Sequence, residues 1–187
     1  PAPPGAQGPV LEIGCGQGSL LTLLAERQVP ASGAELDRDL VEGCCARGLT
    51  VVADDGLDVL ARVPAGSLGA VVAIHVVEHL TPQRLSELVV MACEKLRPGG
   101  WLVMETPNPQ SLYVFARSFF LDPTHQAPVH PAYLEFLVRE AGFGGARIEW
   151  LSPVSEDEAL LDDGTENSRR IASVLFAPQD YRLYAVR

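Results

Sequence analysis

The stretch VLEIGCGQGSL (residues 10–20) decides the fold class of this chain. It starts with a short apolar run typical of a buried strand, passes through three glycines at alternate positions, and ends where Ser19 opens an amphipathic segment. Glycines in a strand-to-helix turn allow positive φ angles and let the backbone approach a ligand, because no Cβ atom intervenes. The stretch therefore predicts a strand, a ligand-binding turn and a helix, in that order.

The rest of the chain alternates short apolar runs with amphipathic stretches, as in a parallel sheet covered by helices. The runs that suit strands lie at residues 10–13, 31–36, 49–53, 70–74, 101–105, 147–151 and 181–186. The sequence thus predicts an α/β, Rossmann-like domain at 9–187, preceded by a linker-like segment at 1–8. Since the chain opens with Pro1, we expect it to begin partway into a longer polypeptide. An acidic helical insert is expected at about 155–177, between the last two strands.

Capping residues mark the helices between these strands. Asp37 can cap a helix after the second strand, and Thr81 with Pro82 predicts the start of the clearest helix in the chain. That helix has apolar residues at helical spacing, namely Leu85, Leu88, Val89, Ala92 and Leu96. Pro131 is expected to begin a later helix, with His130 at its N-terminus.

Composition excludes several classes of protein. The net charge is −10 with scattered Lys and Arg, so no basic face for nucleic acid is expected. No apolar run is long enough for a membrane span, and no signal peptide is recognisable, which predicts a cytoplasmic protein. The four cysteines form no CxxC pair, so we expect buried, reduced thiols rather than a zinc site.

Gly14, Glu35, Asp55 and His75 follow the first four strands at intervals of 21, 20 and 20 residues. Open parallel sheets bind ligands outside the carboxyl ends of their strands, so one ligand lying across these strands would meet all four. Glu35 can accept hydrogen bonds from both hydroxyls of a ribose. Asp54 or Asp55 can accept from the amine of adenine, while the other caps the next helical turn.

The glycine spacing helps to distinguish a nicotinamide dinucleotide from a nucleoside cofactor that has an amino-acid group. A nicotinamide dinucleotide fingerprint is G-x-G-x-x-G, whereas this chain has G-x-G-x-G followed by Ser19. Glu12 lies inside the end of the strand, where a carboxylate would repel a diphosphate but accept from the ammonium group of an amino acid. A nicotinamide-dependent enzyme therefore remains only an alternative.

The segments VLEIGCGQGSLL, GAELD, VVADDGLDVL, AIHVVEHL and LRPGGWLVMETPNP resemble, in order, the consecutive motifs of class I S-adenosylmethionine (SAM)-dependent methyltransferases. The resemblance covers roughly residues 9–110. It implies a seven-stranded, mostly parallel sheet with the last strand antiparallel and helices on both faces. It also implies that SAM is the cofactor and S-adenosylhomocysteine the product.

Family positions assign cofactor contacts by resemblance. Glu12, Gly14 and Gly16 would hold the methionine part of SAM, and Cys15 and Gly18 belong to the same turn. Glu35 would hold the ribose and Leu36 would pack on the adenine. Asp55 and Gly56 would hydrogen-bond the adenine edge, and His75 would line the pocket.

Two later segments, FFLDPTHQAPVHPAYLEFLVREAGF and LFAPQDYRLYAVR, resemble a bacterial and archaeal methyltransferase subgroup often found with polysaccharide and O-antigen biosynthesis genes. This resemblance implies methyl transfer to an oxygen of a small molecule or glycan precursor. A phenol or quinone O-methyltransferase is the alternative enzyme, and a SAM-binding module without turnover is the alternative outside enzymes.

The histidines supply the candidates for catalysis. His125 could accept a hydroxyl proton with Asp122 orienting its imidazole, although a purely structural Asp–His turn is equally compatible with the sequence. His75 is the second catalytic candidate. HVVEH (residues 75–79) matches the HxxEH motif of zinc peptidases, but that motif requires a helix, and here it spans a strand end and a loop. We therefore expect no metal, with a looser divalent site at Glu78 and His79 as the alternative.

Overall fold

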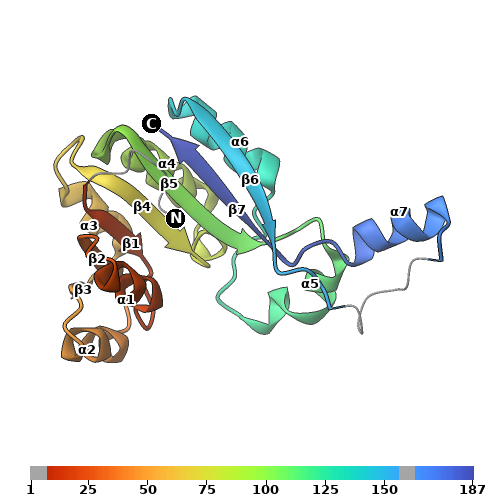
Figure 1. The fold of residues 1–187 in the computed structure, drawn as a ribbon, viewed down its shortest axis with the longest axis horizontal. Helices are drawn as coiled ribbons and strands as arrows, with labels where there is room; N and C mark the ends of the chain where they lie inside the picture. The colour runs from red at the N-terminus through yellow and green to blue at the C-terminus, as the bar shows by residue number, and fades with distance from the viewer. Residues whose placement is uncertain (1–7, 156–162) are drawn as a thin grey trace.

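The computed structural model describes residues 8–155 and 163–187 (Figure 1). One seven-stranded sheet has the order β3-β2-β1-β4-β5-β7-β6. Its strands are β1 (Val10–Ile13), β2 (Ala31–Glu35), β3 (Val51–Ala53), β4 (Leu68–Ile74), β5 (Leu96–Pro107), β6 (Gly145–Leu151) and β7 (Asp180–Val186). The pairs formed by β1 to β5 are parallel, whereas β7 runs antiparallel to both β5 and β6. The expected fold class is confirmed.

Helices cover both faces of the sheet (Figure 1). They are α1 (Ser19–Glu26), α2 (Arg38–Ala46), α3 (Gly56–Arg62), α4 (Pro82–Lys95), α5 (Leu112–Arg117), α6 (Pro131–Glu140) and α7 (Glu166–Leu175), with 3-10 turns η1 (Val77–His79) and η2 (Phe119–Leu121). Alternate residues of β1 point to opposite faces. Leu11 and Ile13 join the main core with residues of α3, α4 and α6, whereas Val10 packs toward α1.

Helix α4 shows why the main core forms where the sequence predicts it. Thr81 Oγ1 accepts a hydrogen bond from the N–H of Arg84, and Pro82 occupies the first turn. The expected apolar stripe is buried throughout, because Leu85, Leu88, Val89, Ala92 and Leu96 are each at most 2% exposed. Each fully buried leucine stabilises the fold by roughly 1.5–3 kcal/mol relative to an exposed one.

Strand β5 begins earlier than expected. The sequence Pro98-Gly99-Gly100 predicts a break before the strand, yet these residues continue it from Leu96. The reason is long-range pairing, since the N–H of Gly99 donates to the carbonyl of Arg187 and the N–H of Arg187 donates to Gly100. The register shift between Leu68 and Ala70 on β4 accommodates the irregularity.

The acidic insert contains helix α7, which projects beyond the sheet next to α5 (Figure 1). None of the residues of α7 is buried, and Ile171 and Val174 are about half exposed. The rings of Tyr113 and Phe176 lie 6.2 Å apart and connect α5 to the end of α7. Residues 156–162 of the expected insert lie outside the described residues. No described helix combines the length and apolarity needed to cross a membrane.

Candidate active site

The turn between β1 and α1 adopts the backbone that its glycines predict. Gly14, Gly16 and Gly18 have φ angles of 64°, 52° and 72°. A Cβ atom on Gly14 would lie 2.6 Å from Cγ2 of Val76, so a side chain there would collide with the segment after β4. The turn therefore requires glycine both for its left-handed backbone and for its close approach to a neighbouring loop.

Glu12 lies beneath this turn and has an unsatisfied carboxylate. Its side chain is on β1 and the residue is only 4% exposed. Its Oε2 atom is buried without a hydrogen-bond partner, and burial raises the pKa of Glu12 to about 7. A buried acceptor without a donor is costly, and a ligand that brings a positively charged donor would relieve that cost.

Glu35 joins the glycine turn to the end of β2. Its Oε2 accepts from the N–H of Gly16 at 2.8 Å. Its Oε1 accepts from the N–H groups of Leu36 and Asp37 at 2.8 and 3.1 Å. Each carboxylate oxygen has two lone pairs, so Oε2 keeps one acceptor position while Oε1 is filled. Glu35 can thus take one ribose hydroxyl as it stands, and the expected contact with both would require Oε1 to exchange its partners.

Asp55 is both a helix cap and a pocket residue. Its Oδ1 accepts from the N–H groups of Leu57 and Asp58 at the start of α3 and from Nη2 of Arg84 at 2.7 Å. The neighbouring Asp54 is ion-paired with Arg62, whose hydrogen bond lowers the pKa of Asp54. Oδ1 of Asp55 is thus occupied by the cap, and Oδ2 is the oxygen available to an adenine amine.

Five of the sequence-predicted cofactor residues line one pocket of about 270 Å³, namely Gly14, Glu35, Leu36, Asp55 and Gly56. Leu36 is 71% exposed there, as expected of an apolar side chain that awaits a partner. A Cβ atom on Gly56 would lie 2.3 Å from Ile13, which explains the glycine at that position. The pocket also includes residues that the sequence did not suggest for the cofactor, namely Val76, His79, Thr81, Arg84 and Gln126.

The other predicted cofactor residues are not among those that line this pocket, namely Glu12, Cys15, Gly16, Gly18 and His75. For His75 the sequence expected a place in the lining, which its neighbour Val76 takes instead. Cys15 is buried, and desolvation, with Glu12 next, raises the pKa of its thiol to about 12. Such a thiol stays protonated at neutral pH and acts as a small packing residue. Cys44 is buried as well, but Cys93 is only partly buried and Cys45 is exposed, so the expectation of four buried thiols holds for Cys15 and Cys44 and fails at Cys45.

His75 directly follows β4, has an unusual backbone conformation and contacts two carboxylates. Its φ is 52°, which is uncommon for a residue with a side chain. Its Nδ1 lies 3.2 Å from Oε1 of Glu78, and its Nε2 lies 3.7 Å from Glu105. The hydrogen bond to Glu78 is the main cause that raises the pKa of His75. The HVVEH segment therefore spans a strand end and a 3-10 turn rather than one helix, as the sequence argument against a peptidase required.

Asp122 does not orient His125 in the way the sequence suggested. Nδ1 of His125 lies 2.6 Å from the carbonyl of Phe119, while its Nε2 is 4.0 Å from Asp122, too far for a hydrogen bond. Asp122 instead accepts from the N–H and the hydroxyl of Thr124, since a carboxylate readily bonds the backbone two residues ahead. His125 is thus oriented by a backbone carbonyl, and the Phe119 ring lies 4.6 Å from its own.

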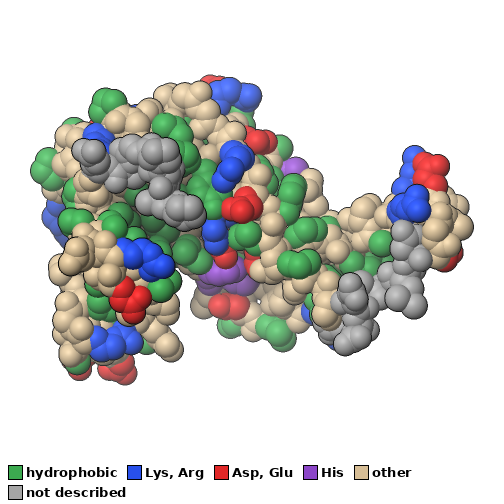
Figure 2. All heavy atoms as spheres, in the orientation of Figure 1, with side chains coloured by type: hydrophobic (Ala, Val, Ile, Leu, Met, Phe, Trp, Pro, Cys, Tyr) green, Lys and Arg blue, Asp and Glu red, His purple; other side chains and the backbone are tan. Residues whose placement is uncertain are grey.

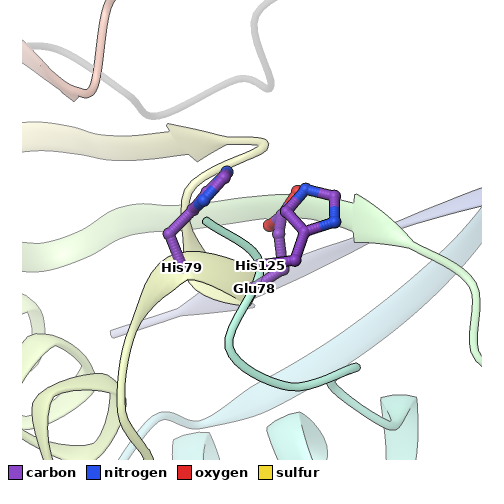
Figure 3. Close-up of side chains that lie close together, drawn as sticks. All are labelled: Glu78, His79 and His125. Carbon is purple, nitrogen blue, oxygen red and sulfur yellow. The ribbon is translucent and has the colours of Figure 1, made fainter. Parts of the chain in front are cut away.

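The loop that carries His125 is attached to η1. The N–H of Gln126 donates to the carbonyl of Glu78 at 2.8 Å, and the rings of His79 and His125 are 4.7 Å apart. Figure 2 shows imidazole groups gathered beside acidic side chains on this face, and Figure 3 shows Glu78, His79 and His125 close together. The sequence placed His79 and His125 in separate roles, because no local pattern connects the two segments. His130 caps α6 through its Nδ1, as expected.

Comparisons with known proteins agree with this geometry. Residues 2–145 match the model of a family described as a methyltransferase domain. The chain is 33% identical to a probable S-adenosylmethionine-dependent methyltransferase of Mycolicibacterium smegmatis, over 72% of this chain and 51% of that protein. It thus spans about half the length of that relative. It is also 28% identical to a ubiquinone biosynthesis O-methyltransferase of Chromobacterium violaceum, over 84% of this chain and 75% of that protein.

A solved structure extends the similarity to nearly the whole chain. The crystal structure of a SAM-dependent methyltransferase from Archaeoglobus fulgidus superposes with a TM-score of 0.91 and 33% identity, covering 98% of this chain and 87% of that one. The residues of this chain also fit SAM, because the unpartnered carboxylate oxygen of Glu12 could accept from an ammonium group and the glycines leave room where a Cβ would clash. The chain therefore belongs to the methyltransferase-domain family, and its fold is that of a SAM-dependent methyltransferase.

Proposed function

We propose that this domain transfers the methyl group of SAM to a hydroxyl oxygen of a small molecule. The observation that carries the proposal is the orphaned Oε2 of Glu12 beneath the glycine turn, beside a pocket whose polar residues suit a nucleoside. The ammonium of the methionine part lies against Glu12. The ribose lies at the open acceptor position of Glu35, and the adenine lies between Leu36 and Asp55.

The transfer itself requires little covalent chemistry from the protein. SAM supplies a methyl group on a sulfonium centre, which activates the methyl carbon toward a nucleophile. The acceptor oxygen forms a bond to that carbon, the carbon–sulfur bond breaks with its electron pair returning to sulfur, and the hydroxyl proton leaves. Positioning of the two reactants supplies most of the acceleration.

His125 is the group that takes the hydroxyl proton in the metal-free protein. Because its Nδ1–H donates to the carbonyl of Phe119, its Nε2 has a free lone pair and can act as a base. The carboxylate of Asp122 lies 4.0 Å from this Nε2. His75 stays next to the glycine turn and, through its hydrogen bond to Glu78, positions the residues of η1.

The first acceptor class that we propose is a glycan precursor, as the resemblance of the segment after β5 implies. The second is a phenol, and a specific observation favours it. Two relatives, from Chromobacterium violaceum and Methylococcus capsulatus, are ubiquinone biosynthesis O-methyltransferases. Moreover, Phe120 is 73% exposed on η2, where an aromatic ring could stack.

An acceptor screen with methyl-labelled SAM tests the proposal. Nucleotide sugars and lipid-linked glycans form one arm, and quinol-like phenols form the other. We expect label to appear on oxygen in one arm and S-adenosylhomocysteine to form in equal amount. His125→Asn, assayed with a chelator present, should reduce turnover by roughly 10²–10⁴-fold while leaving SAM affinity intact.

The matched control for that variant is His130→Asn, which changes a histidine that caps α6 outside the site. Its turnover should equal that of the native protein. Binding of SAM without transfer to any acceptor would contradict the proposal and identify a binding module.

A further inference from the structure

We propose that Glu78, His79 and His125 form a binding site for one divalent first-row transition-metal ion. The ion would hold the acceptor oxygen next to the methyl group, and this last part rests on the proposed function. One potential ligand atom from each of the three residues lies within 4.8 Å of the other two. The side chains come from η1 and from the loop between η2 and α6, and they converge in Figure 3.

Hydrogen bonds prepare both imidazoles for coordination through the same nitrogen. Nδ1 of His125 is 2.6 Å from the carbonyl of Phe119, which can only accept, so Nδ1 carries the proton. Nδ1 of His79 is 2.9 Å from Oγ1 of Thr124. That hydroxyl donates to Asp122 at 2.6 Å, so it accepts from Nδ1–H of His79. Both Nε2 atoms therefore present lone pairs, and metal-ligating histidines typically use their second nitrogen in this way.

The carboxylate of Glu78 is fully buried, with 0% exposure. Oε1 contacts His75 and Oε2 accepts from the hydroxyl of Thr106 at 2.9 Å. Two oxygens offer about four acceptor positions, so each keeps one for a metal. No lysine or arginine in the described part of the chain forms an ion pair with Glu78. A buried carboxylate needs compensation for its charge. His75, with Nδ1 at 3.2 Å from Oε1, offers part of it, and a divalent cation would add to it.

The backbone fixes the two halves of the site relative to each other. The carbonyl of Glu78 accepts from the N–H of Gln126 at 2.8 Å, one residue after His125. The hydroxyl of Tyr181 on β7 donates to the carbonyl of Val129 at 2.8 Å and holds the same loop from the other side. These contacts bring His125 to His79 without any ion, so the site is preorganised.

The ligand set selects the class of metal. Two imidazoles and one carboxylate suit zinc, iron, cobalt or manganese rather than magnesium or calcium, which prefer oxygen. Tetrahedral ligands at about 2.1 Å from zinc lie about 3.4 Å from one another. The ligand atoms, which lie within 4.8 Å of one another, would therefore move closer together by up to about 1.4 Å on binding zinc.

Three protein ligands leave a coordination position open, as in catalytic zinc sites. His79 lines the cofactor pocket and belongs to the cluster as well, so an ion held here would lie close to the cofactor pocket. An acceptor hydroxyl that coordinates the ion loses its proton to solvent more readily. With an ion bound, His125 would serve as a ligand, and the ion would supply the activation of the acceptor hydroxyl in its place.

Cobalt binding to the purified chain tests the site without relying on activity. The protein is first stripped with a chelator and then titrated with Co²⁺, followed by calorimetry and visible absorption. We expect one ion per chain and a spectrum without the sulfur-to-cobalt charge-transfer band that ligation by the exposed Cys45 would add. Mg²⁺ should not compete at equal concentration.

His79→Gln and His125→Gln should each weaken Co²⁺ affinity by at least about tenfold, and the double variant should abolish stoichiometric binding. His130→Gln is the control, because this histidine lies on the same segment but outside the cluster, and its Co²⁺ affinity should be unchanged. Circular dichroism confirms that the variants fold. Absence of stoichiometric Co²⁺ binding, or equal affinity in the native protein and both cluster variants, would overturn the proposal.

A final measurement separates this proposal from the proposed function. SAM binding is measured by calorimetry on stripped and loaded protein, and the acceptor screen is run on both. Faster methyl transfer by the loaded protein supports the metal-held acceptor. Equal rates in the two states overturn that role while leaving methyl transfer intact, and a chain that binds Co²⁺ but not SAM contradicts the proposed function alone.

Discussion

At the scale of single residues, Glu12 has opposing effects on stability and binding. Burial raises its pKa from 4.5 to about 7 in the folded protein, so folding favours the protonated form. Between pH 4.5 and 7, Glu12 is ionised in the unfolded chain but still protonated in the folded protein. The free energy of unfolding therefore falls by about 3 kcal/mol as pH rises through that window. Binding of a positively charged ammonium requires the ionised form and offsets this loss.

We predict that Glu12→Gln separates these effects. At pH 8 the variant should be more stable than the native protein in the absence of cofactor, because glutamine cannot ionise, and at pH 5 the two should match. Its affinity for S-adenosylhomocysteine should fall roughly 10- to 100-fold, the value of a charge-assisted hydrogen bond. Calorimetry and thermal unfolding at both pH values measure the two effects.

The native protein should also bind S-adenosylhomocysteine more weakly as pH drops below about 7. Glu26→Gln, at an exposed end of α1, is the control and should change neither quantity. A Glu12→Gln protein with native affinity at pH 8 would show that the ammonium lies elsewhere.

A second residue-scale prediction concerns Glu35. Glu35→Ala removes the open acceptor position of Oε2 and should cost about 1.5–3 kcal/mol of cofactor affinity. It also leaves the N–H of Gly16 without its partner, so we expect a lower melting temperature as well. Glu35→Gln keeps one carbonyl oxygen and should recover part of the stability but less of the affinity. Equal affinity of all three proteins for S-adenosylhomocysteine would mean that Glu35 serves the turn alone.

At the scale of elements, the N-termini of α2 and α3 form a matched pair. Oδ1 of Asp37 accepts from two N–H groups at 2.9 and 3.3 Å, and Oδ1 of Asp55 does the same at 2.9 and 3.3 Å. Only Asp55 lines the cofactor pocket. Asparagine caps helices about as well as aspartate, so the same substitution can remove charge while preserving each helix.

We predict that Asp55→Asn weakens SAM binding because the new amide nitrogen, like the adenine amine, is a donor. We expect roughly a tenfold loss of affinity, with the melting temperature lowered only by the loss of the ion pair with Arg84. Asp37→Asn should leave affinity unchanged. Calorimetry and thermal unfolding of both variants provide the measurement, and equal losses of affinity would place the effect in the helix caps rather than in adenine recognition.

The sequence predicted elements well where the signal is local. Thr81 and Pro82 start α4, and the apolar spacing of Leu85 and Leu88 identifies its buried face. The sequence could not predict that Gly99 and Gly100 continue β5, because the partner that holds them, Arg187, lies at the other end of the chain. Tyr113 and Phe115 lie on helix α5, and Phe119 and Phe120 lie on η2, in a segment where the sequence analysis predicted no helix.

The residues of the candidate site also divide into those that local sequence patterns predict and those that depend on long-range contacts. The positions of Gly14, Glu35 and Asp55 around one pocket follow from the order of parallel strands, which local patterns predict. The hydrogen-bond partner of His125 could not be predicted, because it is the backbone carbonyl of Phe119 and every residue has such a carbonyl. The sequence spacing suggested Asp122 instead. The approach of His79 to His125 depends on a backbone hydrogen bond between η1 and a distant loop.

At the scale of the whole molecule, the cofactor pocket connects segments that are otherwise joined mainly through the sheet. Its lining comes from the ends of β1, β2 and β3 and from the segment after β4, with Gln126 from the loop before α6. A ligand that contacts all of these segments binds the folded chain and not the unfolded one. Ligand binding should therefore raise the free energy of unfolding by mass action.

We predict that S-adenosylhomocysteine stabilises the protein and that NAD does not. A ligand present at 100 times its dissociation constant adds about 2.7 kcal/mol, which for a domain of this size raises the melting temperature by roughly 5–11 °C. NAD carries a diphosphate that Glu12, once ionised, would repel across the glycine turn. Thermal unfolding with each ligand at equal concentration, at pH 8, measures the difference. Adenosine alone serves as the control, because it fills the nucleoside part of the pocket without an ammonium group and should give a smaller shift. A larger shift of the melting temperature with NAD than with S-adenosylhomocysteine would contradict the assignment of Glu12 to the cofactor ammonium. NAD has no amino-acid ammonium group, so Glu12 could not be the residue that favours its binding.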